Sequence, residues 1–98
     1  MDVAPYLLRA ARALLGMSQD ELAGFADISR RSLAKIESGD RTILLANYDA
    51  VRRVLEGRGI EFIPGTERCG PGLRISIGLA SKLSVPDRHV SDSKGLSR

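Results

Sequence analysis

The chain has 98 residues, of which 43% are hydrophobic and only 4% aromatic, so we expect one domain with a core of Leu, Ile, Val and Ala. The formal net charge is +3, but residues 1–65 carry nine basic and nine acidic side chains, and the basic excess lies in residues 66–98. Net charge bears on solubility and non-specific attraction, so it does not by itself indicate a nucleic-acid partner.

Cysteine and histidine usage excludes two kinds of site. Cys69 is the only cysteine and His89 the only histidine, so the chain has neither the pair needed for an internal disulfide nor a Cys/His cluster for zinc. We expect no metal and no cofactor. The sequence shows no hydrophobic leader and no long apolar run, which predicts a soluble, cytoplasmic protein without a membrane-spanning segment.

The first two predicted helices each have a clear start signal. The first runs from Pro5 to Leu15, because proline is tolerated in an opening turn, and Gly16 ends it. Its apolar residues at helical spacing are Leu7, Leu8, Ala11, Leu14 and Leu15. The second begins at Ser18 and runs to about Ala26, because Ser18 and Glu21 have the spacing at which each side chain accepts a backbone N–H of the other.

A third helix, from about Arg30 to Ser38, follows after only three residues, Asp27 to Ser29. Ser29 can cap its start, and Gly39 can take the left-handed conformation that closes a helix. A turn this short forces the second and third helices to cross at a large angle. The pattern is therefore typical of a helix-turn-helix unit.

A fourth helix has two possible starts, Thr42 and Asn47, of which we favour Asn47, with Gly57 or Gly59 as its end. Its inner stripe would consist of Tyr48, Val51, Val54 and Leu55. We expect residues 43–45 to pack beneath it.

Two short alternating segments follow, IEFI at residues 60–63 and LRISI at residues 73–77. Their pairing as a hairpin would place Leu73, Ile75 and Ile77 on one face. A lone two-stranded hairpin is marginal in water, so it must pack on the helices or pair with a second chain. We expect a homodimer through residues 60–77, with capping of the chain's own helices as the alternative.

The predicted fold is thus mainly α: a compact bundle of four to five helices with a helix-turn-helix, then a short C-terminal strand pair and a flexible tail. The corresponding segments are residues 1–59, residues 60–78 and residues 79–98. The last segment is rich in serine and charge and has little periodicity.

The third helix has two different faces. Leu33 and Ile36 define its buried side, and spacings of three and four residues place a polar stripe opposite them. The stripe consists of Arg31, Ala34, Lys35 and Ser38, with Arg30 beside it. Such a face suits the major groove, where an arginine fork fits guanine O6 and N7 and a small alanine lets the backbone approach. The alternative is an ordinary solvated helix face.

Residues 8–39, LRAARALLGMSQDELAGFADISRRSLAKIESG, resemble the XRE-type, phage-repressor-like family of helix-turn-helix transcriptional regulators. The motif residues that carry the resemblance are Arg12, Ser18, Gln19, Leu22, Ala23, Ser29, Ile36, Glu37 and Gly39. Asp27 stands where the family usually has glycine. Because Asp reaches positive φ more easily than most residues, we expect the turn to survive with modest strain.

The resemblance implies specific binding to double-stranded operator DNA, commonly as a dimer on inverted half-sites. It implies that Gln19 and Ser29 touch phosphates or base edges, and that Arg41 meets the DNA backbone. The residues implied to read the major groove are Arg30, Arg31 and Lys35. Arg12 and Glu37 would form a structural ion pair between the first and third helices.

The function that these patterns favour is a sequence-specific DNA-binding regulator, most simply a repressor. The alternative is a protein-interaction module, such as an antitoxin-like or accessory partner subunit, whose β segment adds to another protein's sheet. We expect no enzyme, because Asp20 and Glu21 are helix-start residues and Ser32 has no nearby base. No small-molecule ligand is evident from the sequence.

Overall fold

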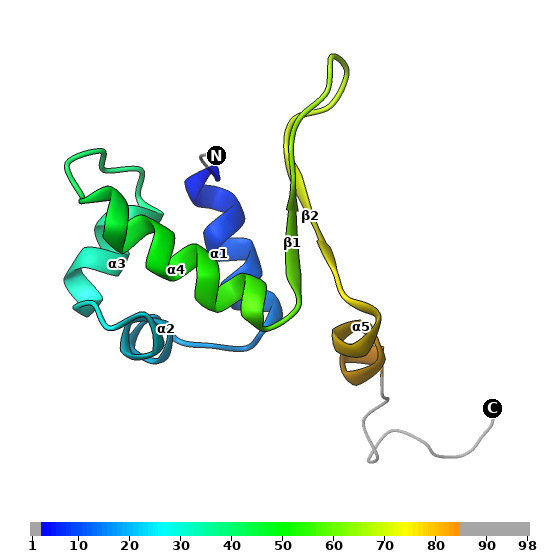
Figure 1. The fold of residues 1–98 in the computed structure, drawn as a ribbon, viewed down its shortest axis with the longest axis horizontal. Coiled ribbons are helices and arrows are strands. Elements are labelled where there is room, and N and C mark those ends of the chain that lie inside the picture. Colours follow the sequence, from blue (N-terminus) through cyan, green and yellow to red (C-terminus); the bar gives the residue numbers. More distant parts are fainter. Residues whose placement is uncertain (1–2, 85–98) are drawn as a thin grey trace.

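The computed structural model describes residues 3–84 and has a mainly α architecture with one two-stranded sheet after the fourth helix (Figure 1). The helices are α1 (Pro5–Leu14), α2 (Gln19–Ala26), α3 (Arg30–Glu37), α4 (Leu45–Gly57) and α5 (Ile77–Ser84), and the strands are β1 (Ile60–Ile63) and β2 (Gly72–Ile75). Among these residues, no helix combines the length and apolar character needed to cross a bilayer. The predicted fold class is confirmed.

The start signals read from the sequence are present at α2 and α3. Ser18 Oγ accepts a hydrogen bond from the Glu21 N–H at 3.0 Å, and Glu21 Oε1 accepts one from the Ser18 N–H at 2.8 Å. Ser29 Oγ accepts from the Ser32 N–H at 3.0 Å. Side-chain caps of this kind satisfy backbone donors that have no partner within the helix, so both helix starts are fixed locally.

The turn between α2 and α3 closes without a glycine. Asp27 takes the left-handed conformation with φ 58° and ψ 45°, and the Ile28 N–H donates to Ala23 O at 3.0 Å. Asp is one of the few residues with a side chain that enters this region at low cost. The positive φ expected at Asp27 is therefore confirmed, and the helix-turn-helix is intact.

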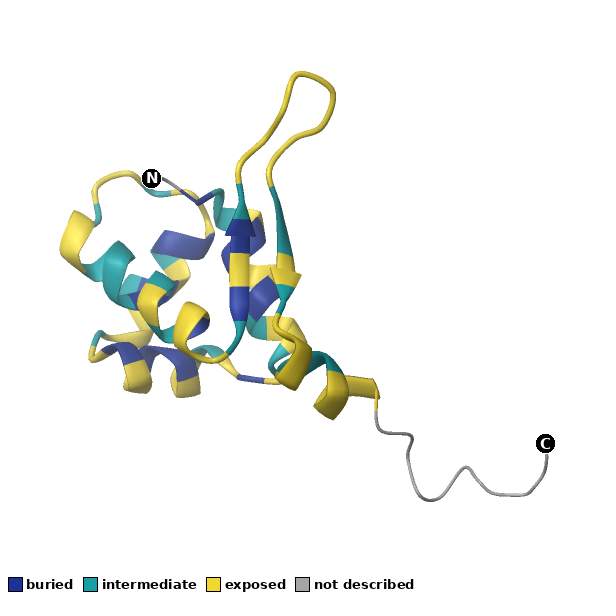
Figure 2. Ribbon diagram, turned by 45° about the vertical axis from the view of Figure 1, so that its right-hand side comes forward, coloured by how far each residue is buried: buried dark blue, intermediate teal, exposed yellow. Residues whose placement is uncertain are grey.

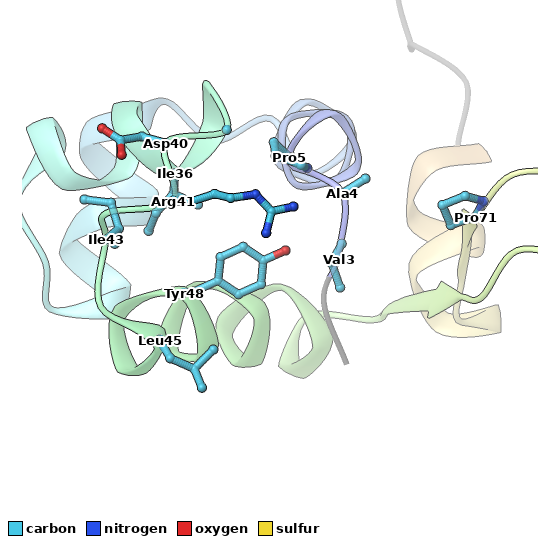
Figure 3. A pocket seen from close by; sticks show the side chains of 11 residues that line it. Val3, Ala4, Pro5, Ile36, Asp40, Arg41, Ile43, Leu45, Tyr48 and Pro71 are labelled. Atoms are coloured by element: carbon cyan, nitrogen blue, oxygen red, sulfur yellow. The ribbon is translucent and has the colours of Figure 1, made fainter.

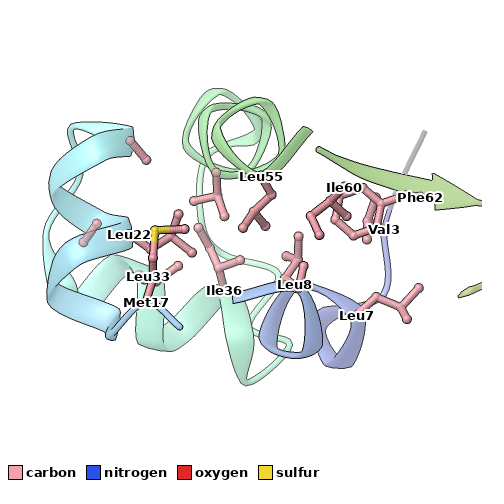
Figure 4. Packing of buried hydrophobic residues seen from close by; sticks show 14 residues of the cluster. Val3, Leu7, Leu8, Met17, Leu22, Leu33, Ile36, Leu55, Ile60 and Phe62 are labelled. Atoms are coloured by element: carbon pink, nitrogen blue, oxygen red, sulfur yellow. The ribbon is translucent and has the colours of Figure 1, made fainter. Parts of the chain in front are cut away.

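The hydrophobic core joins α1, α2, α3, α4 and β1 in one cluster (Figure 4). Its largest fully buried side chains are Leu8, Leu22, Leu33, Ile36, Val51 and Leu55. Ile60 and Phe62 of β1 are 3% and 8% exposed and belong to the same cluster. The strand pair is therefore part of the core of the helices.

The two strands form an antiparallel hairpin in which Ile60 pairs with Ile75 and Phe62 with Leu73. These four side chains face the core. On the opposite face Arg74 Nε lies 3.2 Å from Glu61 Oε1. Figure 2 shows that the long loop at the far end of the hairpin is exposed throughout. The expected hairpin, with Leu73 and Ile75 on its inner face, is confirmed.

The predicted start of α4 is wrong. The helix begins at Leu45, with Leu44 at the capping position, and uses neither Asn47 nor Thr42. Thr42 instead donates to Asp40 Oδ1 from its N–H at 2.8 Å and from its hydroxyl at 2.6 Å. These two hydrogen bonds hold Thr42 in a local turn before the helix. Leu44 and Leu45 are 70% and 65% exposed, so of residues 43–45 only Ile43 packs against the core.

The second strand is shorter than expected and passes into a helix. Ser76 ends it, because the Ser76 N–H donates to Gly59 O at 2.8 Å while Ser76 Oγ accepts from the Leu79 N–H at 3.1 Å and starts α5. Ile77 is consequently 87% exposed, and its expected place on the inner face is wrong. Residues 79–84 of the predicted flexible tail are helical, and residues 85–98 lie outside the described part of the chain.

Candidate nucleic-acid interface

Helix α3 separates its apolar and basic residues onto two faces. Leu33 and Ile36 are 0% and 2% exposed. On the other side Lys35 is half-buried, while the exposed residues are Arg30, Arg31, Ala34 and Ser38. The structure thus places the predicted polar stripe on α3 and its C-cap residue, beside the start of α2. Figure 1 shows α2 and α3 following each other at the same end of the bundle.

The far end of α3 is tied to α1 by a nearly buried carboxylate. Arg12 Nε lies 2.7 Å from Glu37 Oε2 and Arg12 Nη2 lies 3.0 Å from Oε1, so the contact is bidentate. The Glu37 side chain is 2% exposed and that of Arg12 20%. Arg12 also donates to Met17 O at 3.0 Å. The structure therefore contains the ion pair that the resemblance implied, and it anchors α3 to the rest of the fold.

Two further side chains converge on Glu37. Gln19 Nε2 donates to Glu37 Oε1 at 3.0 Å, and Arg9 Nη1 donates to the Glu37 backbone oxygen at 3.4 Å. Sequence reasoning placed Gln19 only at the DNA, and it did not consider Arg9. No helical or strand spacing links residues so far apart in the chain, so only the tertiary fold could reveal these contacts.

These donors decide the ionisation of Glu37. Burial penalises its charged form, but the hydrogen bonds from Arg12 and Gln19, together with the charges of Arg12 and Arg9, outweigh that penalty. The pKa of Glu37 is therefore lowered from its ordinary value of 4.5. The hydrogen bond to Glu37 in turn raises the pKa of Arg12. The pair stays ionised at neutral pH.

The basic side chains of α3 form few and weak ion pairs with other described residues. Arg30 Nε lies 3.7 Å from Asp20 Oδ1, and both side chains are mostly exposed, so this pair contributes only about 0–1 kcal/mol. Within residues 3–84, neither Arg31 nor Lys35 forms an ion pair. Ser38 Oγ donates to Lys35 O at 2.8 Å. The arginine forks are thus available to an anionic partner.

Arg41 lies apart from the α3 face, on the loop between α3 and α4. It is exposed, and its side chain extends over a pocket beside Tyr48 (Figure 3). The expected residues therefore fall into three groups. Arg30, Arg31, Ala34 and Lys35 lie on α3 with Ser38 at its C-cap, Gln19 and Ser29 stand at or beside helix starts, and Arg41 occupies the loop.

A tight pair of helices with a basic outer face on the second is the architecture of a helix-turn-helix DNA-binding domain. A helix-turn-helix family model matches residues 8–61, and the chain belongs to this family, the XRE-type regulators. The match begins within α1, covers α2 to α4 and reaches the first residues of β1. A search of curated proteins gave no match. The protein is thus a DNA-binding helix-turn-helix regulator.

Proposed function

We propose that this regulator is a repressor that places α3 in the major groove of an operator and thereby blocks a promoter. The observation that supports this most is the arrangement of α3, whose apolar face is fully committed to the core while Arg30 and Arg31 are exposed. A major groove about 12 Å wide admits one helix. Blocking a promoter in this way requires only DNA binding and no catalytic group.

Each residue expected at the DNA has a proposed role. Arg31 and Lys35 read base edges, Arg30 assists at the start of the helix, and Ala34 lets the backbone approach. Gln19 and Ser29 stand at the starts of α2 and α3, where backbone N–H groups attract phosphate. Ser38 lies at the end of the same stripe, and Arg41 is assigned to the DNA backbone. Backbone contacts set the register, while base contacts supply specificity.

The test is a fluorescence anisotropy titration against DNA from upstream of the protein's own reading frame and against a scrambled duplex, at low and physiological salt. We expect binding to the upstream DNA to be tighter by about a thousandfold or more at physiological salt. Arg31→Ala should weaken binding by about 1–3 kcal/mol and relax specificity. Arg53→Ala, which removes an exposed arginine of α4, is the matched control. Equal affinity for both duplexes, lost as salt rises, would contradict specific recognition of this DNA.

The direction of regulation has a separate test. Run-off transcription from a promoter that contains the bound DNA should fall as the protein is added. An increase would contradict the repressor role and leave DNA binding intact.

We also propose a homodimer joined through residues 60–77, with α5 extending the contact. Each strand of the hairpin has one edge that pairs with no other described strand, while Ile77 and Leu83 are 87% and 46% exposed. Two recognition helices spaced about 34 Å apart would match one turn of DNA.

Sedimentation at tens of micromolar should give a dimer that Ile77→Lys disrupts. Leu44→Lys, at another exposed leucine, should leave it unchanged. One protomer with and without DNA would contradict the dimer.

The same unpaired strand edges support the second candidate, a module that adds its hairpin to the sheet of a partner protein. Arg31→Ala separates the two functions, because it should weaken operator binding by about 1–3 kcal/mol and leave any partner complex intact.

A further inference from the structure

A pocket of about 460 Å³ lies where the start of α1, the α3–α4 loop and the start of α4 meet (Figure 3). Small-molecule sites usually measure about 300–1,000 Å³, so this one can hold a compact ligand. Its walls are mainly apolar and include Val3, Pro5, Ile36, Ile43 and Leu45. Its polar side chains are Asp40, Arg41 and Tyr48. The pocket lies outside the α3 face and is not used by the proposed contacts with bases.

The lining of the pocket carries one cation, Arg41, and one anion, Asp40. Asp40 accepts two hydrogen bonds from Thr42, which lower its pKa and keep it ionised. Arg41 forms no ion pair with any residue in the range 3–84. Figure 3 shows its guanidinium beside the Tyr48 ring over the pocket, while the Asp40 carboxylate points away. Over mainly apolar walls, the pocket thus presents a guanidinium that forms no ion pair with any described residue, while the carboxylate in its lining is turned elsewhere.

We propose that this pocket binds a small carboxylic acid with an aromatic or branched aliphatic body, and that the bound carboxylate holds Arg41 away from the DNA backbone. A guanidinium fork matches a carboxylate through two parallel hydrogen bonds. The apolar walls accept the body of the ligand by burial. A multiply charged phosphate compound fits less well, because the described lining supplies only one cation.

The coupling to DNA rests on the proposed function, in which Arg41 meets a phosphate. Ile36 of α3 and Gly39, two residues after its end, line the same pocket, so the ligand would sit directly behind the recognition helix. A guanidinium engaged by a carboxylate in the pocket is not available to DNA. Linkage requires the effect to be reciprocal, so bound DNA should lower the protein's affinity for the ligand by the same factor.

Binding is tested without DNA, by two-dimensional NMR on the full chain. The probe is 3-phenylpropionate, and the uncharged control compound is 3-phenylpropanamide. We expect saturable shifts of the backbone N–H signals of Arg41, Ile43 and Tyr48 at millimolar 3-phenylpropionate. The control compound 3-phenylpropanamide should bind at least about tenfold more weakly, a difference of 1.4 kcal/mol. Arg41→Met should remove this preference, whereas Arg53→Met should retain it. No saturable shifts at these residues, or equal binding of both compounds, would overturn the site.

The coupling is tested by repeating the operator titration with and without 3-phenylpropionate. The probe should weaken operator binding and reduce the slope of log affinity against log salt by about 0.9, the value of one phosphate contact. Arg41→Met should show the reduced slope without the probe and no response to it. Saturable binding of 3-phenylpropionate by NMR with unchanged operator affinity would overturn the coupling, while the binding site itself would remain supported. Absence of specific DNA binding in the probe-free protein would count against the proposed function alone.

Discussion

At the scale of single residues, the carboxylate of Glu37 holds together parts of the chain that are far apart in sequence. It receives hydrogen bonds from Arg12 of α1 and Gln19 of α2, and it lies at the end of α3, the helix that we propose to enter the major groove. Because Glu37 is almost fully buried and Arg12 is only partly exposed, removing either charge leaves the other without adequate solvation.

Glu37→Gln should therefore lower the free energy of unfolding by about 3 kcal/mol, the lower end of the range for a broken buried pair because Arg12 retains some water. Urea unfolding at neutral pH measures this. Glu61→Gln, which breaks the exposed pair with Arg74, is the control and should change stability by at most about 1 kcal/mol. Equal effects of the two substitutions would contradict the anchoring role of Glu37.

The lowered pKa of Glu37 predicts a specific acid sensitivity. The folded state favours the ionised carboxylate, so the unfolded chain takes up the proton at higher pH than the native protein does. The contribution of Glu37 is complete above its ordinary pKa of 4.5 and is lost as pH falls through the lower folded value. The stability difference between the wild type and Glu37→Gln should thus shrink in urea titrations from neutral pH to about pH 3. A difference independent of pH would contradict this assignment.

At the scale of elements, the link between α4 and β1 depends on Gly59. This residue has φ +107°, and a Cβ there would lie 2.7 Å from Ser76 Oγ and 3.1 Å from Leu79 Cβ. Gly57, near the end of α4, has nothing within 4 Å of the corresponding position. The two glycines therefore form a matched pair in which only one is structurally required.

Gly59→Ala should lower the free energy of unfolding by about 2 kcal/mol or more, because both the backbone and the contact with Ser76 are strained. Gly57→Ala should leave stability unchanged or raise it by up to about 1 kcal/mol. Thermal and urea unfolding measure both. A similar response of the two variants would show that the hairpin does not depend on this close approach.

The elements that could be predicted from sequence are those whose signals are local. The capping pair at Ser18 and Glu21, the turn at Asp27 and the closing glycine at Gly39, with φ 87°, needed only neighbouring residues. Errors arose where a distant or competing contact decided the structure. Asp40 diverted Thr42 into a turn before α4, and Gly59 held Ser76 so that the next residue entered a helix.

The candidate site follows the same rule. The basic stripe of α3 could be predicted because helical periodicity alone defines both of its faces. The contact of Gln19 with Glu37 and the pocket beside Arg41 could not be predicted, because each depends on how separate helices are placed. Arg41 was expected only at the DNA, and the structure adds its position over the pocket.

At the scale of the whole molecule, the hairpin and the helices share one core, so the helix-turn-helix is completed by residues that follow it. Phe62 is 8% exposed and packs in the same cluster as Leu8 and Leu55. This arrangement explains how a two-stranded hairpin, marginal alone in water, is held in place.

Phe62→Ala should accordingly destabilise the whole chain by about 3–5 kcal/mol in a single cooperative transition. Leu44→Ala, at a leucine that is 70% exposed, should change stability by no more than about 0.5 kcal/mol. Circular dichroism of the helices during urea unfolding provides the measurement. If Phe62→Ala left the helical transition unchanged, the hairpin would be energetically separate from the helices.

The two faces of α3 also bear on how such a protein can evolve. Residues that determine folding, such as Leu33 and Glu37, occupy different positions from Arg31 and Ala34, which face outward. Exposed substitutions away from special contacts usually change stability by less than about 0.5 kcal/mol. Under the proposed role of α3, a duplicated copy could therefore acquire a new DNA preference through a few exposed changes while both copies remain folded.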